Sequence, residues 1–167
     1  GFLFLNIGHF YDHLFMLLFP TAVLAMAADP VFGGSYADVL SLSVFGFVAF
    51  GAASIPAGWL GDRWSKTGMM SVFFLGIGMA SILTGFARSP LELAVGLTLI
   101  GLFAAIYHPV GIAMVAADAE KLGKALGING VWGNLGVAAA GITAGALADQ
   151  WGWRAVFILP GLVSIAT

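Results

Sequence analysis

The chain has 167 residues, of which 60% are hydrophobic and only 8% are charged, and its formal net charge is −2. Soluble domains carry about 25% charged residues, so this composition excludes an ordinary soluble protein and predicts a membrane protein. The absence of cysteine excludes thiolate metal sites, and the six basic residues are too few for a nucleic-acid partner to be expected.

Six apolar runs follow one another along the chain. A membrane-spanning helix needs about 20 apolar residues. Five runs reach that length and a sixth begins near residue 153. The runs lack the alternation of a membrane β-barrel, so we expect an all-α membrane protein. The expected helices cover residues 2–27, 37–60, 68–87, 90–117, 124–147 and 153 onward, the sixth being truncated.

Two serines mark helix starts in this pattern. Ser89 precedes Pro90 and is followed three residues later by Glu92, which is typical of a capping box with proline at the first helical position. Ser35 and Asp38 have the same spacing before the second helix. We therefore expect both serines to cap the helices that follow them.

The orientation in the bilayer follows from the basic residues of the short connections. Four lie on one side of the predicted bundle and two on the other, namely Arg63, Lys66, Lys121 and Lys124 against Arg88 and Arg154. Cytoplasmic loops carry the excess of Lys and Arg. This predicts cytoplasmic connections after the second and fourth helices, with the first helix starting from the cytoplasm.

An internal repeat joins the two halves of the chain. Segments 58–64 and 145–151 end the second and fifth helices and carry Gly, Leu, Asp and Trp in the same register. The two helices run in opposite directions, so the repeat has inverted topology, as in many secondary carriers. We expect two inverted three-helix repeats, about 1–88 and about 89–167, forming one six-helix bundle.

The end of the second helix carries a recognisable motif. Gly58, Leu60, Asp62, Arg63 and Lys66 resemble the signature between helices 2 and 3 of the major facilitator superfamily, and segment 151–157 resembles that family's start of helix 6. The resemblance implies the N-terminal half of a twelve-helix carrier whose C-terminal half is absent here. It also implies a multi-pass protein, expected in a bacterial inner membrane.

The same resemblance implies a function. We expect a proton-coupled secondary transporter that moves a small organic solute or drug, for example in efflux, by alternating access. It is not expected to be an enzyme or to need a cofactor. Its expected partners are the lipid bilayer, protons, a small-molecule substrate and the C-terminal half.

Two features resemble the fosmidomycin-resistance-type branch of the superfamily. They are the pair His9 and Asp12 in the first helix and the pair His108-Pro109 in the fourth. Many drug:proton antiporters carry an arginine in the fourth helix where this chain has Leu97, so symport and antiport both stay open.

Helix 1 holds the candidate site. His9, Asp12 and His13, together with Asn6, are spaced three, four and seven apart and therefore share one face. An ionisable residue inside a membrane is costly and points to a functional site by default. A carboxylate beside imidazoles suits proton coupling. The other reading is a structural Asp–His pair that fixes helix packing.

A depth argument adds two residues from other helices. With a rise of about 1.5 Å per residue, Asp12, His108 and Asn134 all lie about 14–15 Å from the inner ends of their helices. That depth is near the midplane, where carriers of this kind bind substrate. We therefore expect His108 and Asn134 to join the proton and substrate site. His108 could equally be a core histidine.

Other polar and small residues receive different predictions. Gly58, Asp62, Arg63 and Lys66 are expected to form a conformational gating loop rather than a substrate site. Three histidines without cysteine give little reason for a metal ion, so no metal site is predicted. The glycines of the fifth helix, Gly130, Gly133 and Gly136, are expected to let a neighbouring helix approach closely.

Two alternative functions remain open from the sequence. A non-transporting scaffold or sensor could keep the fold, since a fold alone does not prove a function. A membrane enzyme could use Asp12, His9 and His108, but the sequence supplies no nucleophile with a base and no cofactor loop.

Overall fold

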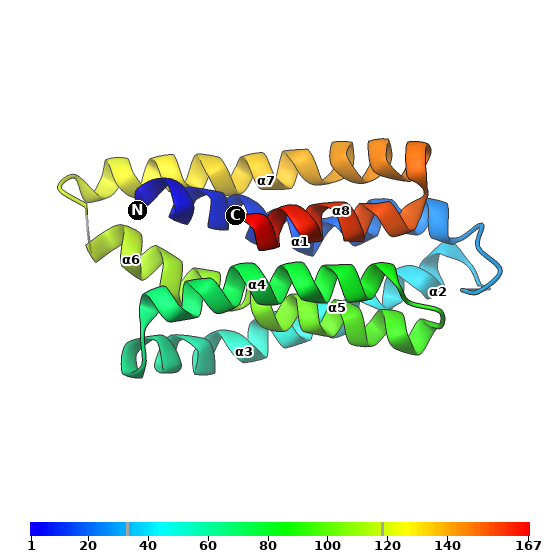
Figure 1. Ribbon diagram of the computed structural model, residues 1–167, viewed down its shortest axis with the longest axis horizontal. Helices are drawn as coiled ribbons and strands as arrows, with labels where there is room; N and C mark the ends of the chain where they lie inside the picture. Colours follow the sequence, from blue (N-terminus) through cyan, green and yellow to red (C-terminus); the bar gives the residue numbers. More distant parts are fainter. Residues whose placement is uncertain (33, 118) are drawn as a thin grey trace.

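The computed structural model is an elongated helical bundle and describes residues 1–32, 34–117 and 119–167 (Figure 1). Its helices run back and forth along the long axis, and every regular element in these ranges is a helix. In chain order they are α1 Phe2–Met26, α2 Tyr36–Ser41, α3 Ser43–Arg63, α4 Lys66–Gly85, α5 Pro90–Ala104, the π-helix η1 Tyr107–Gly111, α6 Ile112–Ala117, α7 Leu122–Trp151 and α8 Trp153–Ala166.

The predicted all-α membrane fold is confirmed. Five spans in the described residues are long and apolar enough to cross a bilayer, and α8 is a shorter apolar helix that follows them. Two spans are less regular than the sequence predicted. The second is divided at Leu42 into α2 and α3, and the fourth is divided into α5, η1 and α6.

Both predicted serine caps are present. Ser35 forms a full capping box: its hydroxyl accepts from the Asp38 N–H, and the Asp38 carboxylate accepts from the Ser35 N–H. Ser89 accepts from the Glu92 N–H at 3.2 Å. The Glu92 carboxylate, however, accepts from the N–H of Arg88 rather than from that of Ser89. The backbone donors at both helix starts are therefore satisfied by side chains.

Three helix pairs hold the bundle together. α1 packs most extensively on α7, α3 on α5, and α4 on α8. Suppose that α1, α3 and α4 exchange places with α5, α7 and α8, in that order. The pair α1–α7 then becomes the pair α5–α3, and the pair α4–α8 becomes itself. This pattern is what two inverted repeats require. The repeat boundaries near residue 88 stay a prediction.

Glycines set the distance between these helices. A Cβ on Gly101 of α5 would collide with the Gly46 carbonyl of α3, and a Cβ on Gly136 of α7 would collide with the Phe10 carbonyl of α1. A Cβ on Gly133 would lie 2.7 Å from Nε2 of His9 in α1, whereas a Cβ on Gly130 would meet open space. Two of the three predicted close-approach glycines therefore face α1.

The outside of the bundle is apolar. Large side chains such as Ile55, Leu91 and Ile142 are 74–82% exposed. The interior is filled by aromatic residues, including Phe15, Phe73 and Tyr107, which are fully buried. An apolar exterior around an apolar core suits a lipid environment. Of the buried polar side chains, Asn6, His9 and Asp12 lie on α1, and Asn129 of α7 bonds to Asn6.

Candidate functional site

Asp12 lies at the centre of a polar cluster between α1 and η1. Its side chain is 1% exposed. Its Oδ2 lies 3.1 Å from Nε2 of His108 and 4.0 Å from Nε2 of His13. Among the described residues, Asp12 Oδ1 is a buried side-chain oxygen without a hydrogen-bond partner. The carboxylate is therefore paired on one side only.

His9 and His13 complete the cluster on the α1 side. Their Nε2 atoms lie 3.2 Å apart, and Nδ1 of His9 donates a hydrogen bond to the Asn129 carbonyl at 2.8 Å. Since that carbonyl can only accept, His9 carries its proton on Nδ1, and its Nε2 presents a lone pair to His13. His9 is buried, while His13 and His108 are about one-third exposed.

The π-helix η1 positions His108. Pro109 cannot donate the backbone hydrogen bond that an α-helix requires, and a local widening of the helix accommodates this loss. The widened turn runs from Tyr107 to Gly111 and presents His108 to α1. Such π-bulges are frequent at functional sites.

A second polar network supports the cluster, and the sequence did not predict it. The buried Asn129 donates to Oδ1 of Asn6 at 3.0 Å and to the Tyr107 hydroxyl at 2.8 Å. The Tyr107 hydroxyl in turn donates to the Leu5 carbonyl at 2.7 Å, and its ring stacks on His9. The network joins α1, η1 and α7, so it fixes the side chains that surround Asp12.

The structure leaves Asn134 outside this arrangement. Its amide donates to the Gly130 carbonyl of its own helix at 2.9 Å, and its side chain is exposed. Of the residues predicted for the site, His9, Asp12, His13 and His108 come together, while Asn134 lies on another face of α7. Its predicted role stays untested.

The signature residues lie within helices, whereas the sequence predicted that they form a loop. Gly58, Asp62 and Arg63 belong to the last turns of α3, and Lys66 begins α4, so only two residues connect the helices. Asp62 pairs with Lys66 at 2.7 Å, and Arg63 lies over the Trp59 ring. A Cβ on Gly58 would lie 3.0 Å from Pro109. The signature end of α3 therefore packs against the π-helix that carries His108.

The opposite end of the bundle has its own polar contacts. Asp29 accepts hydrogen bonds from the Val31 N–H and from the Trp153 indole, which hold the pKa of its carboxyl below the usual value. Arg154 donates to the carbonyls of Gly85 and Ala87 at 3.0 and 2.9 Å. These bonds tie the start of α8 to two connections.

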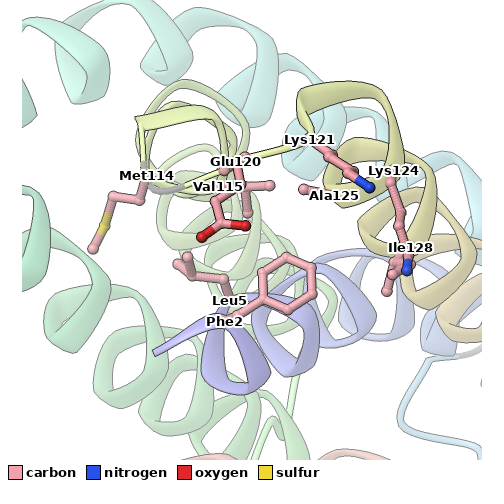
Figure 2. A pocket seen from close by; sticks show the side chains of 10 residues that line it. Phe2, Leu5, Met114, Val115, Glu120, Lys121, Lys124, Ala125 and Ile128 are labelled. Atoms are coloured by element: carbon pink, nitrogen blue, oxygen red, sulfur yellow. The ribbon is translucent and has the colours of Figure 1, made fainter.

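The pocket of Figure 2 lies away from the polar cluster. It has a volume of about 420 Å³ and is formed by the ends of α1, α6 and α7, with Glu120, Lys121 and Lys124 beside Phe2 and Met114. No residue of the predicted site lines it. Its three charged side chains lie at the connection between α6 and α7 and in the first turn of α7. We therefore assign this pocket no role in the polar cluster.

Comparison with known proteins gives several related sequences, including the following three. The puromycin resistance protein of Streptomyces alboniger is 31% identical over 64% of this chain. A probable hexose phosphate transport protein of Chlamydia pneumoniae is 38% identical over 62%, and a multidrug resistance protein B homolog of Mycobacterium tuberculosis is 28% identical over 75%. The matches cover 22%, 25% and 24% of those relatives, so the chain corresponds to a fraction of their length.

The family profile gives a match over nearly the whole chain. The profile of the Major Facilitator Superfamily covers residues 5–167, and thus includes the polar cluster, the signature segment and the start of α8. This family consists of transporters and not of enzymes, which removes the enzyme alternative. The fosmidomycin-resistance-type branch stays a prediction. The chain belongs to the Major Facilitator Superfamily, a family of integral membrane transporters.

Proposed function

We propose that this chain is half of a proton-coupled secondary carrier that moves a small organic solute or drug by alternating access. The proposal rests on the surroundings of the Asp12 carboxylate. This group is buried in a membrane span, paired with His108 of another span and unpaired on its second oxygen. Carriers of this architecture bind substrate and coupling ion near the midplane, between helices of the two repeats.

The pair can respond to a proton and to the conformational cycle. Asp12 belongs to α1, whereas His108 belongs to the π-helix on which the signature end of α3 packs. A movement of α3 would therefore change the distance between Asp12 and His108. Protonation of the carboxylate would remove the ionic part of their attraction, and the solute or the C-terminal half would meet a neutral group.

The relatives guide the choice of substrate and membrane. Their names include puromycin resistance, multidrug resistance and hexose phosphate transport, so a small organic solute is the substrate class we propose. They come from bacteria, and we place the carrier in a bacterial plasma membrane. The C-terminal half would supply the other wall of the cavity.

The test is transport by the whole carrier in proteoliposomes with an imposed pH gradient. Puromycin and a hexose phosphate serve as first substrates, and a chelator removes stray metal ions. Asp12→Asn keeps the shape but removes the titratable charge, so we expect proton-driven accumulation to be abolished in a folded protein. His108→Gln should slow transport and change its pH profile.

Two results would contradict the proposal. Accumulation by Asp12→Asn at the wild-type rate and with the wild-type pH profile would make the cluster a packing feature. The absence of any proton-driven flux across a broad panel of organic solutes would favour the non-transporting scaffold or sensor.

A further inference from the structure

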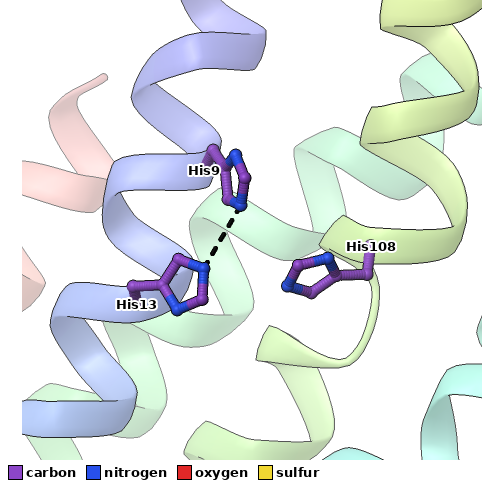
Figure 3. A group of neighbouring side chains, drawn as sticks. All are labelled: His9, His13 and His108. Carbon is purple, nitrogen blue, oxygen red and sulfur yellow. Dashed lines mark hydrogen bonds between the residues drawn. The ribbon is translucent and has the colours of Figure 1, made fainter. Parts of the chain in front are cut away.

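All three histidines of the chain lie in one cluster. His9, His13 and His108 each bring a ring nitrogen to within 4.8 Å of the others, although His108 is far from the other two along the sequence (Figure 3). The figure shows the imidazoles of α1 and η1 facing one another. Nothing in proton coupling by Asp12 requires three imidazoles to converge.

His9 turns a ring lone pair toward His13, whose Nε2 proton would be released when a metal ion binds. Because Nδ1 of His9 donates to the Asn129 carbonyl, its Nε2 lone pair faces Nε2 of His13, 3.2 Å away. A tetrahedral ion with metal–nitrogen distances of about 2.0–2.1 Å holds its ligand atoms about 3.3 Å apart. The separation of these two nitrogens therefore fits one edge of such a site. A metal-binding imidazole usually donates its other N–H to a carbonyl or carboxylate, as His9 does to the Asn129 carbonyl.

Asp12 provides an anionic donor beside the imidazoles. Its Oδ2 lies 3.1 Å from Nε2 of His108, which fits a second edge, and 4.0 Å from Nε2 of His13. Across the part of the chain that the structure covers, its Oδ1 is left with no donor despite being buried. Buried polar atoms are almost always paired, so this oxygen has capacity for a cation.

We propose that His9, His13, His108 and Asp12 bind one divalent transition-metal ion of the Zn²⁺ type. Three imidazoles and one carboxylate suit Zn²⁺, Co²⁺, Ni²⁺ or Cu²⁺, whereas Ca²⁺ and Mg²⁺ require oxygen ligands. His13 and His108 are about one-third exposed, so they give the ion a route in and can rotate to close the longer separations. Metal binding goes beyond the proposed function, because it needs neither a proton gradient nor an organic solute.

The sequence offered little reason to expect a metal, because the chain has three histidines and no cysteine. His9 and His13 lie one helical turn apart, but the third imidazole joins them only through the π-helix. Depth along the helices placed His108 at the level of Asp12, but it did not show that the ring nitrogens converge.

The test is metal titration of the whole carrier, purified in detergent with a tag that contains no histidine. Zn²⁺ is measured by calorimetry and Co²⁺ by its visible spectrum. We expect one ion per carrier with a dissociation constant in the micromolar range or below, and the intense visible bands of four-coordinate Co²⁺. His13→Gln and His108→Gln should each weaken binding at least tenfold, because each removes a ligand.

Asp149→Asn is the matched control, since it removes an exposed carboxylate at the far end of α7 and should leave the affinity unchanged. Absence of saturable binding, a six-coordinate Co²⁺ spectrum, or wild-type affinity in both histidine variants would overturn the site. The wild-type spectrum decides even if a variant does not fold. A failed transport assay in chelator would count against the proposed function and not against this site.

Discussion

The side chains around Asp12 differ in burial and in hydrogen bonding. His108 comes from an irregular helix and is one-third exposed, whereas His9 is buried and anchored to the Asn129 carbonyl. The carboxylate thus has one adjustable partner beside a fixed frame. A group that must gain a proton, or bind a cation, and release it again needs this combination, because a fully satisfied buried carboxylate would hold one state.

The frame itself can be tested at Asn129. Asn129→Leu removes the hydrogen bonds to Asn6 and Tyr107 but keeps the backbone carbonyl that accepts from His9. Hydrogen bonds between membrane helices average about 0.6 kcal/mol and reach about 1.7. We expect the two losses to cost about 1–2 kcal/mol, measured by thermal unfolding of the whole carrier in detergent. Asn134→Leu is the control, because its amide bonds only to its own helix. Equal destabilisation by both substitutions would contradict the structural role of Asn129.

The sequence predicted four residues of the cluster but not the network that supports them, and the structure shows why. Intramembrane charge and helical spacing were enough to select His9, Asp12 and His13, and depth added His108. Depth also added Asn134, whose side chain lies outside the cluster, because depth fixes the height of a residue and not the direction of its side chain. Asn129 and Tyr107 gave no signal, since an amide or a phenol in an apolar helix shows its partners only when the helices are packed.

At the scale of the elements, glycines and proline decide how close the helices come. Pro109 lies in the fourth span, but its position in the sequence gives no way to foresee a π-helix that turns His108 toward Asp12. The glycines of α7 were predicted to form a thin surface. Only Gly133 and Gly136 meet α1, because Gly130 lies on another part of the helix.

This difference between glycines gives a matched prediction. Gly136→Ala places a Cβ against the Phe10 carbonyl, and a backbone atom cannot move aside easily. We expect it to cost about 1–3 kcal/mol, as overpacking usually does. Gly130→Ala meets open space and should be neutral or stabilise by about 0.5–1 kcal/mol, because alanine favours helix. Thermal unfolding of the two variants, side by side, checks this. A stable Gly136→Ala protein would mean that α1 and α7 are not packed so closely.

For the whole molecule, the fold was predicted better than the site. Length and hydropathy fix the number of spans, and a bilayer leaves helices as the simple solution for such spans. The pairing of α1 with α7 and of α3 with α5 could not be read from these quantities, because it depends on which faces carry small residues. The repeat between segments 58–64 and 145–151 relates α3 to α7. The same relation converts the pair α1–α7 into the pair α5–α3, so the short motif and the helix packing agree.

The orientation of the bundle in the membrane gives the last prediction. The basic connections after the second and fourth spans favour the cytoplasm, and the chain has no cysteine, so a single introduced thiol is a unique label within it. Thr67 lies in the first turn of α4 at one end of the bundle and Gln150 in the last turn of α7 at the other, as the ends of these helices in Figure 1 show, and both residues are exposed. In the whole carrier, with cysteines elsewhere replaced, we expect a membrane-impermeant thiol reagent to label Gln150→Cys in intact cells. Thr67→Cys should be labelled only in inverted vesicles. The reverse pattern would invert the bundle and place the signature residues Asp62 and Arg63 outside the cell, and labelling of both from one side would contradict the five spans.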